Sequence, residues 1–150
     1  MTKTCEQLKL ENQLCFPLYA ASRLTTKLYA PHLKQLDITY PQYLVLLVLW
    51  EYETMAVKDI GSLLFLESNT LTPLLKRLEQ KELVSRTRAT DDERTVHIAL
   101  TAKGKQLQVA AASIPKEIER HFANDSFSDE ELKDFRNNLV KLLSLLHKQL

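Results

Sequence analysis

The stretch ESNTLTPLLKRLEQKELVSRTRATDDERTVHIALTAKG, from Glu67 to Gly104, contains the change of pattern that decides the fold. In its first half, leucines recur at helical spacing after small polar residues that can cap a helix beginning at Asn69 or Thr70. Pro73 is tolerated there because first-turn N–H groups are unpaired in any case. In its second half, apolar and polar residues alternate on both sides of the charged segment ATDDER. This alternation predicts a two-stranded hairpin with a polar tip.

Two helices are predicted before this stretch. The first covers about residues 6–30 and ends near Pro31. It must either kink or restart at Pro17, because proline has no backbone N–H and disfavours helical geometry at the residue before it. The second helix is capped by Thr39 and runs to about Glu51, and its nearly continuous apolar surface predicts a central position in the core.

A short helix over 57–65 completes the part of the chain that precedes the decisive stretch. After the hairpin, a helix begins at Thr101 and bends at Pro115, and a last helix begins at the capping box of 128–131. The order helix, helix, hairpin is that of a winged helix-turn-helix. We therefore predict a mainly α fold with a small β-hairpin wing, in which residues 39–100 form a DNA-binding lobe.

The composition fits a single globular chain domain over residues 1–150. Hydrophobic residues make up 45% and charged residues 26% of the chain, and with two glycines tight turns should be few. The first twenty residues lack a signal-peptide pattern, and the longest apolar run, 43–50, is too short to cross a bilayer. We expect a cytoplasmic protein with reduced thiols and no membrane partner.

The candidate recognition helix presents short hydrogen-bonding side chains first and basic side chains further along, an order that suits the major groove of DNA. Five basic residues oppose two glutamates between 68 and 90, a local charge of +3, whereas the whole chain carries +1. At the hairpin tip, Arg94 can enter a narrow minor groove while the carboxylate of Asp92 holds its guanidinium. The predicted DNA-binding residues are Ser68, Asn69, Thr70, Thr72, Pro73, Lys76, Arg77, Arg86, Arg88, Asp92 and Arg94. Alternatively, these charges are ordinary solvated surface and the winged helix binds a protein.

The segment DERTVHIALTAKG resembles the wing signature of the MarR family of bacterial transcription regulators, in which an Asp-x-Arg pair precedes a strand ending in Leu-Thr-x-x-Gly. ESNTLTPLLKRLEQKELVSRTR resembles the recognition helix and first wing strand of the same family. LENQLCFPLYAASR and LDITYPQYLVLLVLWE are similar to the first two helices of the OhrR branch, the organic-hydroperoxide-sensing repressors. The branch usually has Asp-Ser-Gly where this chain has Glu67-Ser68-Asn69, so operator details are not carried over.

The resemblance implies a homodimer that binds a pseudo-palindromic DNA operator through two winged helices. Residues 1–38 and 101–150 would then be dimerisation helices that intertwine with those of the second copy. The residue pattern agrees with this expectation, because the first and last helices carry apolar stripes that a single small lobe would struggle to cover.

Cys15 taken alone is a cysteine in an apolar helical stripe, and its neighbours Leu14 and Phe16 favour an inert, neutral thiol. Tyr19 lies one turn further along the same face. Tyr29 lies fourteen residues from Cys15, which is about 21 Å along a straight helix. Tyr29 can therefore meet Cys15 only if an antiparallel copy of the helix crosses a dimer axis.

The resemblance implies that Cys15 is a peroxide sensor and that Tyr19, Tyr29 and Tyr40 support its thiolate. Attack by this thiolate on an organic hydroperoxide gives a sulfenic acid. A coupling of roughly 1–3 kcal/mol between oxidation and DNA binding would weaken binding about 5- to 150-fold. The late resolving cysteine of two-cysteine branch members is missing here, so a low-molecular-weight thiol is expected to cap oxidised Cys15, with Cys5 incidental.

Three alternative functions compete with this one. A MarR-type repressor could instead be released by a small phenolic or aromatic ligand in the dimer cleft. A thiol peroxidase using Cys15 lacks an activating Arg and Thr at short spacing and leaves the DNA-binding half unexplained. A metal-responsive regulator is disfavoured because the four histidines are widely scattered. We therefore expect no enzymatic activity, no metal and no cofactor.

Overall fold

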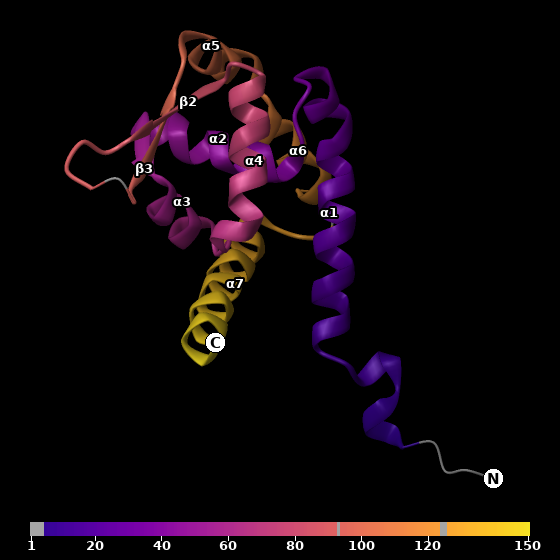
Figure 1. Ribbon diagram of the computed structural model, residues 1–150. Coiled ribbons are helices and arrows are strands. Elements are labelled where there is room, and N and C mark those ends of the chain that lie inside the picture. The colour runs from indigo at the N-terminus through magenta and orange to yellow at the C-terminus, as the bar shows by residue number, and fades with distance from the viewer. Residues whose placement is uncertain (1–4, 93, 124–125) are drawn as a thin grey trace. The chain divides into compact units, whose positions relative to one another are not determined.

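The computed structural model describes residues 5–92, 94–123 and 126–150, which are mostly helical and include one small sheet (Figure 1). Contacts within the chain separate a first unit, which ends at Ala112, from a second unit, Ser113–Leu150. The first unit contains two 3-10 turns (Glu6–Leu8 and Leu10–Asn12), α1 (Cys15–Gln35), α2 (Tyr40–Tyr52), β1 (Thr54–Ala56), α3 (Val57–Leu64), α4 (Ser68–Gln80), β2 (Val84–Arg88), β3 (Val96–Leu100) and α5 (Ala102–Ala111). The second unit contains α6 (Ile114–Phe122) and α7 (Asp129–Gln149).

The first helix differs from its prediction at both ends. α1 begins at Cys15, and the residues before it form short turns, so Pro17 lies in the first turn, where its missing N–H breaks no helical bond. Of the two alternatives at Pro17, the chain thus adopts the restart. The prediction that the helix ends near Pro31 is wrong, because α1 continues through it to Gln35. The added turn carries Leu33, which is 2% exposed, and its burial offsets the single hydrogen bond that Pro31 removes.

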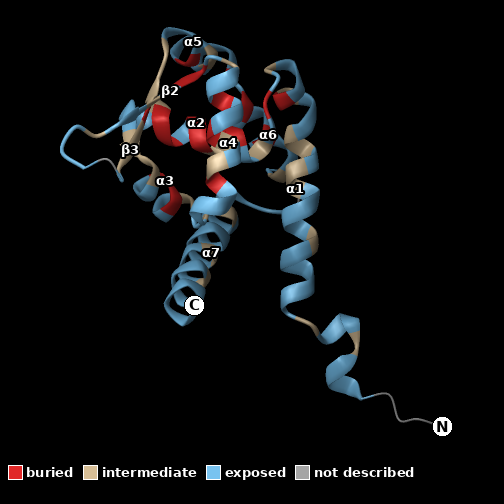
Figure 2. Cartoon of the chain, in the orientation of Figure 1, coloured by how far each residue is buried: buried red, intermediate tan, exposed pale blue. Residues whose placement is uncertain are grey.

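The second helix is confirmed and lies at the centre of the core. The Gln42 N–H donates to the Thr39 hydroxyl (3.4 Å) and the Thr39 N–H donates to the Gln42 side-chain oxygen (3.0 Å), which is a capping box. Buried side chains in the first unit gather on α2 and on the elements around it (Figure 2). Those of α2 are Gln42, Tyr43, Val45, Leu46, Val48 and Leu49.

A tight turn joins α3 to α4 as in a helix-turn-helix. Phe65 adopts left-handed backbone geometry (φ 56°), and the Leu66 N–H donates to the carbonyl of Gly61 (2.9 Å). A Cβ at Gly61 would lie 2.7 Å from the Leu66 carbonyl oxygen, so this close approach requires glycine. Helix α4 then buries Leu71, Leu75 and Leu78.

The start of α4 was predicted one or two residues late. The helix begins at Ser68, and no side chain caps it, because the cap position is taken by Glu67, whose side chain makes no capping bond. Pro73 is therefore in the second turn rather than the first, and it leaves the Asn69 carbonyl without its usual helical donor. The small polar cluster consequently opens the helix without capping it and keeps its side chains available.

The predicted hairpin is confirmed, and it belongs to a larger sheet than expected. β2 and β3 pair antiparallel from Val84↔Leu100 to Arg88↔Val96. β1, which the sequence analysis did not predict, adds a third strand on the other side of β3, with Met55 opposite Ile98. The hairpin is thereby joined to the segment between α2 and α3.

The predicted starts of the C-terminal helices are confirmed, but their number is not. Thr101 caps α5 by accepting from the Gly104 N–H (3.1 Å), as predicted. The single bent helix predicted around Pro115 is instead two helices, because α5 ends at Ala111 and Pro115 occupies the first turn of α6, where proline is favourable. Ser128 begins α7 with the predicted capping box. Within the described residues, no helix is long and apolar enough to cross a membrane.

Candidate functional site

The outer face of α4 carries the predicted recognition residues. Its apolar stripe faces the core, which leaves Ser68, Asn69 and Thr70 exposed at the start of the helix and Lys76 and Arg77 exposed further along. Pro73 is also exposed, between these two groups. The order of polar side chains first and basic side chains later therefore holds on a surface that DNA can reach.

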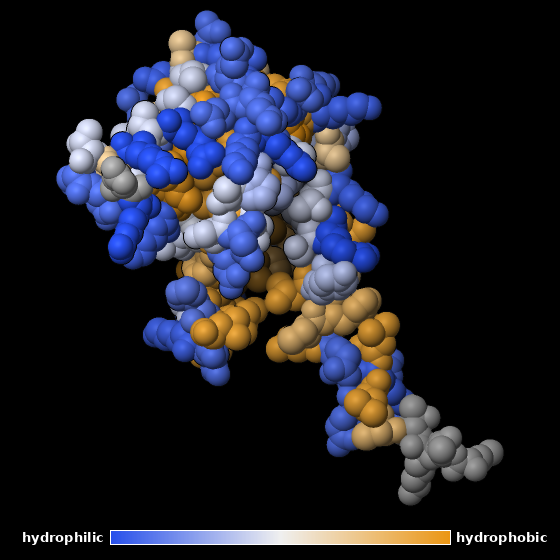
Figure 3. Space-filling model, viewed as in Figure 1, coloured by the Kyte–Doolittle hydropathy of each residue, from blue (hydrophilic) through white to orange (hydrophobic). Residues whose placement is uncertain are grey.

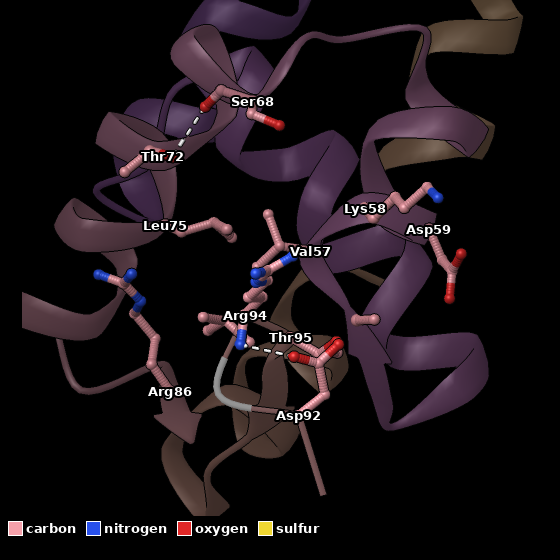
Figure 4. A pocket seen from close by; sticks show the side chains of 12 residues that line it. Val57, Lys58, Asp59, Ser68, Thr72, Leu75, Arg86, Asp92, Arg94 and Thr95 are labelled. Carbon is pink, nitrogen blue, oxygen red and sulfur yellow. Dashed lines mark hydrogen bonds between the residues drawn. The ribbon is translucent and has the colours of Figure 1, made fainter. Parts of the chain in front are cut away.

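Thr72 differs from its neighbours on this face. Its hydroxyl donates to the carbonyl of Ser68 (2.7 Å), so the hydroxyl proton is used inside the helix (Figure 4). The Thr72 oxygen keeps its ability to accept a hydrogen bond. The side chain is therefore suited to a donor on DNA, such as an exocyclic amino group, rather than to a phosphate oxygen.

The carboxylate of Asp92 organises the backbone of the hairpin tip. It accepts from the Arg94 N–H (3.0 Å) and from the Thr95 hydroxyl (3.4 Å), and the Thr95 N–H donates to the Asp92 carbonyl (3.0 Å). The predicted contact with the Arg94 guanidinium is not found among the described residues. Asp92 thus fixes the direction in which Arg94 leaves the chain, and the exposed guanidinium stays available for DNA.

Arg86 of β2 lies between the hairpin and α4 rather than on the open surface. One guanidinium nitrogen is 3.9 Å from the Glu79 carboxylate of α4. Its Nε is buried and has no hydrogen-bond partner within the described chain. A buried N–H of a charged group without an acceptor is costly, whereas the Arg86 side chain as a whole is 27% exposed, so its accessible part can meet an anionic oxygen.

A cavity of about 560 Å³ brings these groups together (Figure 4). It lies between α3, the first turns of α4 and the hairpin. Its polar lining includes Lys58, Ser68, Thr72, Arg86, Asp92 and Arg94. The three cations come from three separate parts of the fold, and Asp59 and Asp92 also line the hollow, so its net charge is +1, the sign that attracts the phosphate backbone of DNA. Arg88 lies at the end of β2 and is exposed.

Cys15 is the first residue of α1 and its thiol is exposed. The N-terminus of a helix favours a nearby negative charge, because its backbone N–H groups are unpaired and the helix dipole is positive there. The neighbouring side chains are apolar and are also exposed to solvent: Leu14 is 85% exposed, and Phe16 and Leu18 are exposed as well. Figure 3 shows apolar residues gathered over the first part of α1 and the turns before it. An apolar molecule could therefore approach the thiol directly.

The tyrosines form a cluster at the other end of α1. The Tyr29 ring lies 4.9 Å from that of Tyr40 and 5.8 Å from that of Tyr43, and the latter two rings are 6.2 Å apart. Burial raises the pKa of all three phenols above the ordinary value, that of Tyr43 to about 12. Their hydroxyls consequently remain protonated near neutral pH and can donate to an anion.

Tyr43 was not among the tyrosines predicted for this site. A signal was present, because Tyr43 lies three residues after Tyr40 in a helix that was correctly predicted, and such residues share a face. The second helix was predicted to be central as a whole, and Tyr43 lies in the core with only 3% of its surface exposed.

Within one chain, Cys15 and the tyrosine cluster are not brought together. Cys15 and Tyr29 lie on the same uninterrupted helix, so Tyr29 is about 21 Å from Cys15 along its axis. Tyr19, one turn after Cys15, is 62% exposed and has the Arg23 guanidinium 5.0 Å above its ring. The chain therefore presents two half-sites at opposite ends of α1.

Comparison with known proteins identifies the family of the chain. A family model described as transcriptional regulator SarA/Rot matches residues 27–110, which include α2, α3, α4 and the whole sheet. The organic hydroperoxide resistance transcriptional regulator of Bacillus subtilis is 50% identical over 149 residues, 99% of each chain.

Solved structures match over nearly the full length. AbfR of Staphylococcus epidermidis, reduced and bound to DNA, is 44% identical with a TM-score of 0.78, over 94% of this chain and 96% of that one. Its disulfide form matches at 44% identity and a TM-score of 0.65, over 95% of each chain. Wild-type MarR from Escherichia coli, at 22% identity and a TM-score of 0.67 over 87% of this chain and 96% of that one, shares the fold. The chain therefore belongs to the MarR-type winged-helix family of transcriptional regulators.

Proposed function

We propose that this regulator is a redox-sensing repressor that binds a pseudo-palindromic operator as a homodimer and leaves it when an organic hydroperoxide oxidises Cys15. The observation that carries the proposal is the exposed thiol at the first position of α1, in an open apolar surround. An apolar surround favours hydroperoxides with an organic substituent over hydrogen peroxide. The name of the Bacillus subtilis relative supports the same class of signal.

The homodimer is supported by apolar side chains that stay exposed on the first and last helices. α7 buries none of its residues, and α1 buries Leu33 alone. The exposed large apolar residues of these helices are Phe16, Leu18, Tyr19, Leu24, Phe135, Val140, Leu143, Leu145 and Leu146. Stripes of this size are covered by a partner in stable proteins. A twofold axis that pairs the helices would set two copies of α4 for half-sites about one DNA turn apart.

The same symmetry would complete the redox site. In an antiparallel pair of α1 helices, Cys15 of one copy meets Tyr29 and Tyr40 of the other, while Tyr19 lies beside it in its own chain. The protonated phenols would donate to the thiolate and stabilise the reactive, charged form. Each dimer then carries two equivalent sensors, one near each end of the paired helices.

On the DNA side, the exposed face of α4 would enter the major groove and the hairpin would reach the adjacent minor groove. Ser68, Asn69, Thr70 and Thr72 are the candidate base and backbone contacts at the start of α4. Arg94, aimed by Asp92, is the candidate minor-groove contact. Pro73, Lys76, Arg77, Arg86 and Arg88 complete the proposed surface, and its cations would neutralise phosphates.

The redox chemistry proceeds in two balanced steps. The Cys15 thiolate attacks the terminal peroxide oxygen, the O–O bond breaks, and the alkoxide leaves as an alcohol after taking a proton, so the cysteine becomes a sulfenic acid. The thiolate of a low-molecular-weight thiol then attacks that sulfur, forms a mixed disulfide and displaces hydroxide, which takes a proton to become water. A larger polar group among packed tyrosines would alter the helix pairing and hence the spacing of the two α4 helices. Each protein molecule is oxidised once per cycle, as a switch and not as an enzyme.

A gel-shift titration tests the proposal directly. Reduced wild-type protein should retard an operator fragment from near its own gene, and cumene hydroperoxide should release it; Cys15→Ser should bind and stay bound. Cys5→Ser should respond like the wild type. If Cys15→Ser is released to the same extent by peroxide, the sensor assignment is wrong. Release of both proteins by a phenolic compound, and of neither by peroxide, would favour the small-ligand alternative.

The role of Cys5 is tested separately. Cys5 is exposed and its thiol lies 2.7 Å from the side-chain oxygen of Gln7. Non-reducing electrophoresis and intact mass after peroxide should show Cys15 capped by the added thiol in both wild type and Cys5→Ser. A disulfide within or between chains that disappears in Cys5→Ser would show instead that Cys5 resolves the sulfenic acid.

A further inference from the structure

Tyr43 lies in the middle of a row of aromatic rings along one face of α2. Tyr40, Tyr43 and Trp50 are three and seven residues apart, which places them on the same side of the helix. The Tyr43 ring lies 6.1 Å from the Trp50 ring in an edge-on arrangement, and tilted rings of Tyr29 and Tyr40 lie on its other side. These are the offset and edge geometries that aromatic pairs prefer.

The three tyrosines differ in depth. Tyr43 is 3% exposed, whereas Tyr29 and Tyr40 are half-buried and have surface through which a partner can reach them. Trp50, at the end of the row, is held in place because its indole N–H donates to the carbonyl of Gly104 in α5 (3.0 Å). Tyr43 therefore lies between a fixed tryptophan and two tyrosines with reachable surface.

We infer that Tyr43 is a positioning residue for the redox site: its ring holds Tyr29 and Tyr40 in the orientation from which their hydroxyls meet the Cys15 thiolate of the second copy. The inference rests on the proposed function and adds a residue to it. Tyr29 comes from α1 and Tyr40 from α2, so their mutual orientation depends on what fills the space behind both rings. Tyr43 is the described aromatic side chain that contacts both.

The ring, rather than the hydroxyl, performs this role. Tyr43 makes its three aromatic contacts through the ring. A phenylalanine keeps those contacts, whereas a leucine replaces a flat ring by a shorter, branched side chain. The two substitutions therefore separate positioning from hydrogen bonding.

The test measures Cys15 reactivity as a function of pH in a Cys5→Ser background, by alkylation with iodoacetamide and by sulfenic acid formation with cumene hydroperoxide. Tyr43→Leu should react more slowly near neutral pH, by roughly three- to tenfold, with its titration midpoint moved to higher pH, since one pH unit is tenfold in thiolate. Tyr43→Phe should match the parent. Trp50→Phe, which keeps a ring but loses the bond to Gly104, should shift in the same direction by less, and it keeps the test decisive if Tyr43→Leu does not fold.

Controls separate positioning from general loosening and from failure of the whole site. Val48→Ala removes buried volume from α2 at a residue outside the ring contacts, and it should leave the pH profile unchanged. The inference is overturned if Val48→Ala shifts the profile as much as Tyr43→Leu, or if Tyr43→Phe behaves like Tyr43→Leu. If Tyr29→Phe slows the reaction and Tyr43→Leu does not, the redox site stands and the positioning role fails. If the parent protein itself never releases DNA on oxidation, the proposed function fails instead.

Discussion

Replacing Lys76 by alanine should reduce the salt dependence of operator binding without unfolding the protein. Lys76 is exposed on α4, one turn beyond Thr72 on the same face, and no ion pair links it to another residue in the described ranges. Its ammonium group can therefore rest against a phosphate when α4 enters the major groove, displacing condensed counterions. Loss of such a contact removes an electrostatic contribution that is independent of base sequence.

The size of the effect follows from the number of contacts. Each neutralised phosphate contributes about 0.9 to the slope of log affinity against log salt concentration. A homodimer presents Lys76 twice, so the slope of Lys76→Ala should be shallower by about 1.8. Between about 50 mM and about 200 mM salt, the wild type should therefore lose about tenfold more affinity than the variant.

Fluorescence anisotropy of a labelled operator duplex, titrated with reduced protein at several salt concentrations, measures this slope. Lys105→Ala is the matched control, because Lys105 lies on α5 and pairs with the Glu53 carboxylate (3.2 Å) rather than with the recognition surface. Its slope should equal that of the wild type. A Lys76→Ala variant that is weaker by the same factor at every salt concentration would refute the phosphate contact, as would an unchanged affinity.

Four further outcomes are expected. Arg94→Ala should weaken operator binding by about 1–3 kcal/mol per half-site in the same assay, without changing the melting temperature. Thr39→Ala removes half of a capping box and should lower the free energy of unfolding by about 1 kcal/mol in urea titrations. Because the folded-state pKa of Tyr43 is raised to about 12, the stability linked to it is complete below about pH 10 and declines as pH rises from there to about 12; Tyr43→Phe should lack that part of the alkaline decline. Gly61→Ala places a methyl group against the Leu66 carbonyl and should lower the melting temperature.

The elements that carry their own signals could be predicted from the sequence. The N-cap at Thr39 and the alternation on both sides of the hairpin tip act over a few residues, and both were found where expected. β1 could not be predicted, because Thr54–Ala56 is too short to show alternation and becomes a strand only by pairing with β3, more than forty residues later. Pairing over such a separation is a tertiary interaction.

Prolines show the same limit at the ends of α1. The sequence required a kink or a restart at Pro17 and left the choice open, because both geometries accommodate a residue without a backbone N–H. Pro31 was predicted to end the helix, yet the burial of Leu33 in the next turn outweighs the lost hydrogen bond. At the candidate site, residue types and spacing identified Tyr29 and Tyr40, but the ring that packs behind them emerged only from three-dimensional contacts.

The short strand β1 has a mechanical consequence for the wing. Glu53 alone separates the end of α2 from β1, and its carbonyl accepts from the Leu100 N–H (3.0 Å), at the end of β3. α2, which carries Tyr40, is therefore joined to β3 without a flexible loop between them. A small rotation of α2 should tilt the whole hairpin, and at the tip the displacement grows with distance from the helix axis. Repression would then respond to the angle of each wing within its own half-site, in addition to the distance between the two recognition helices.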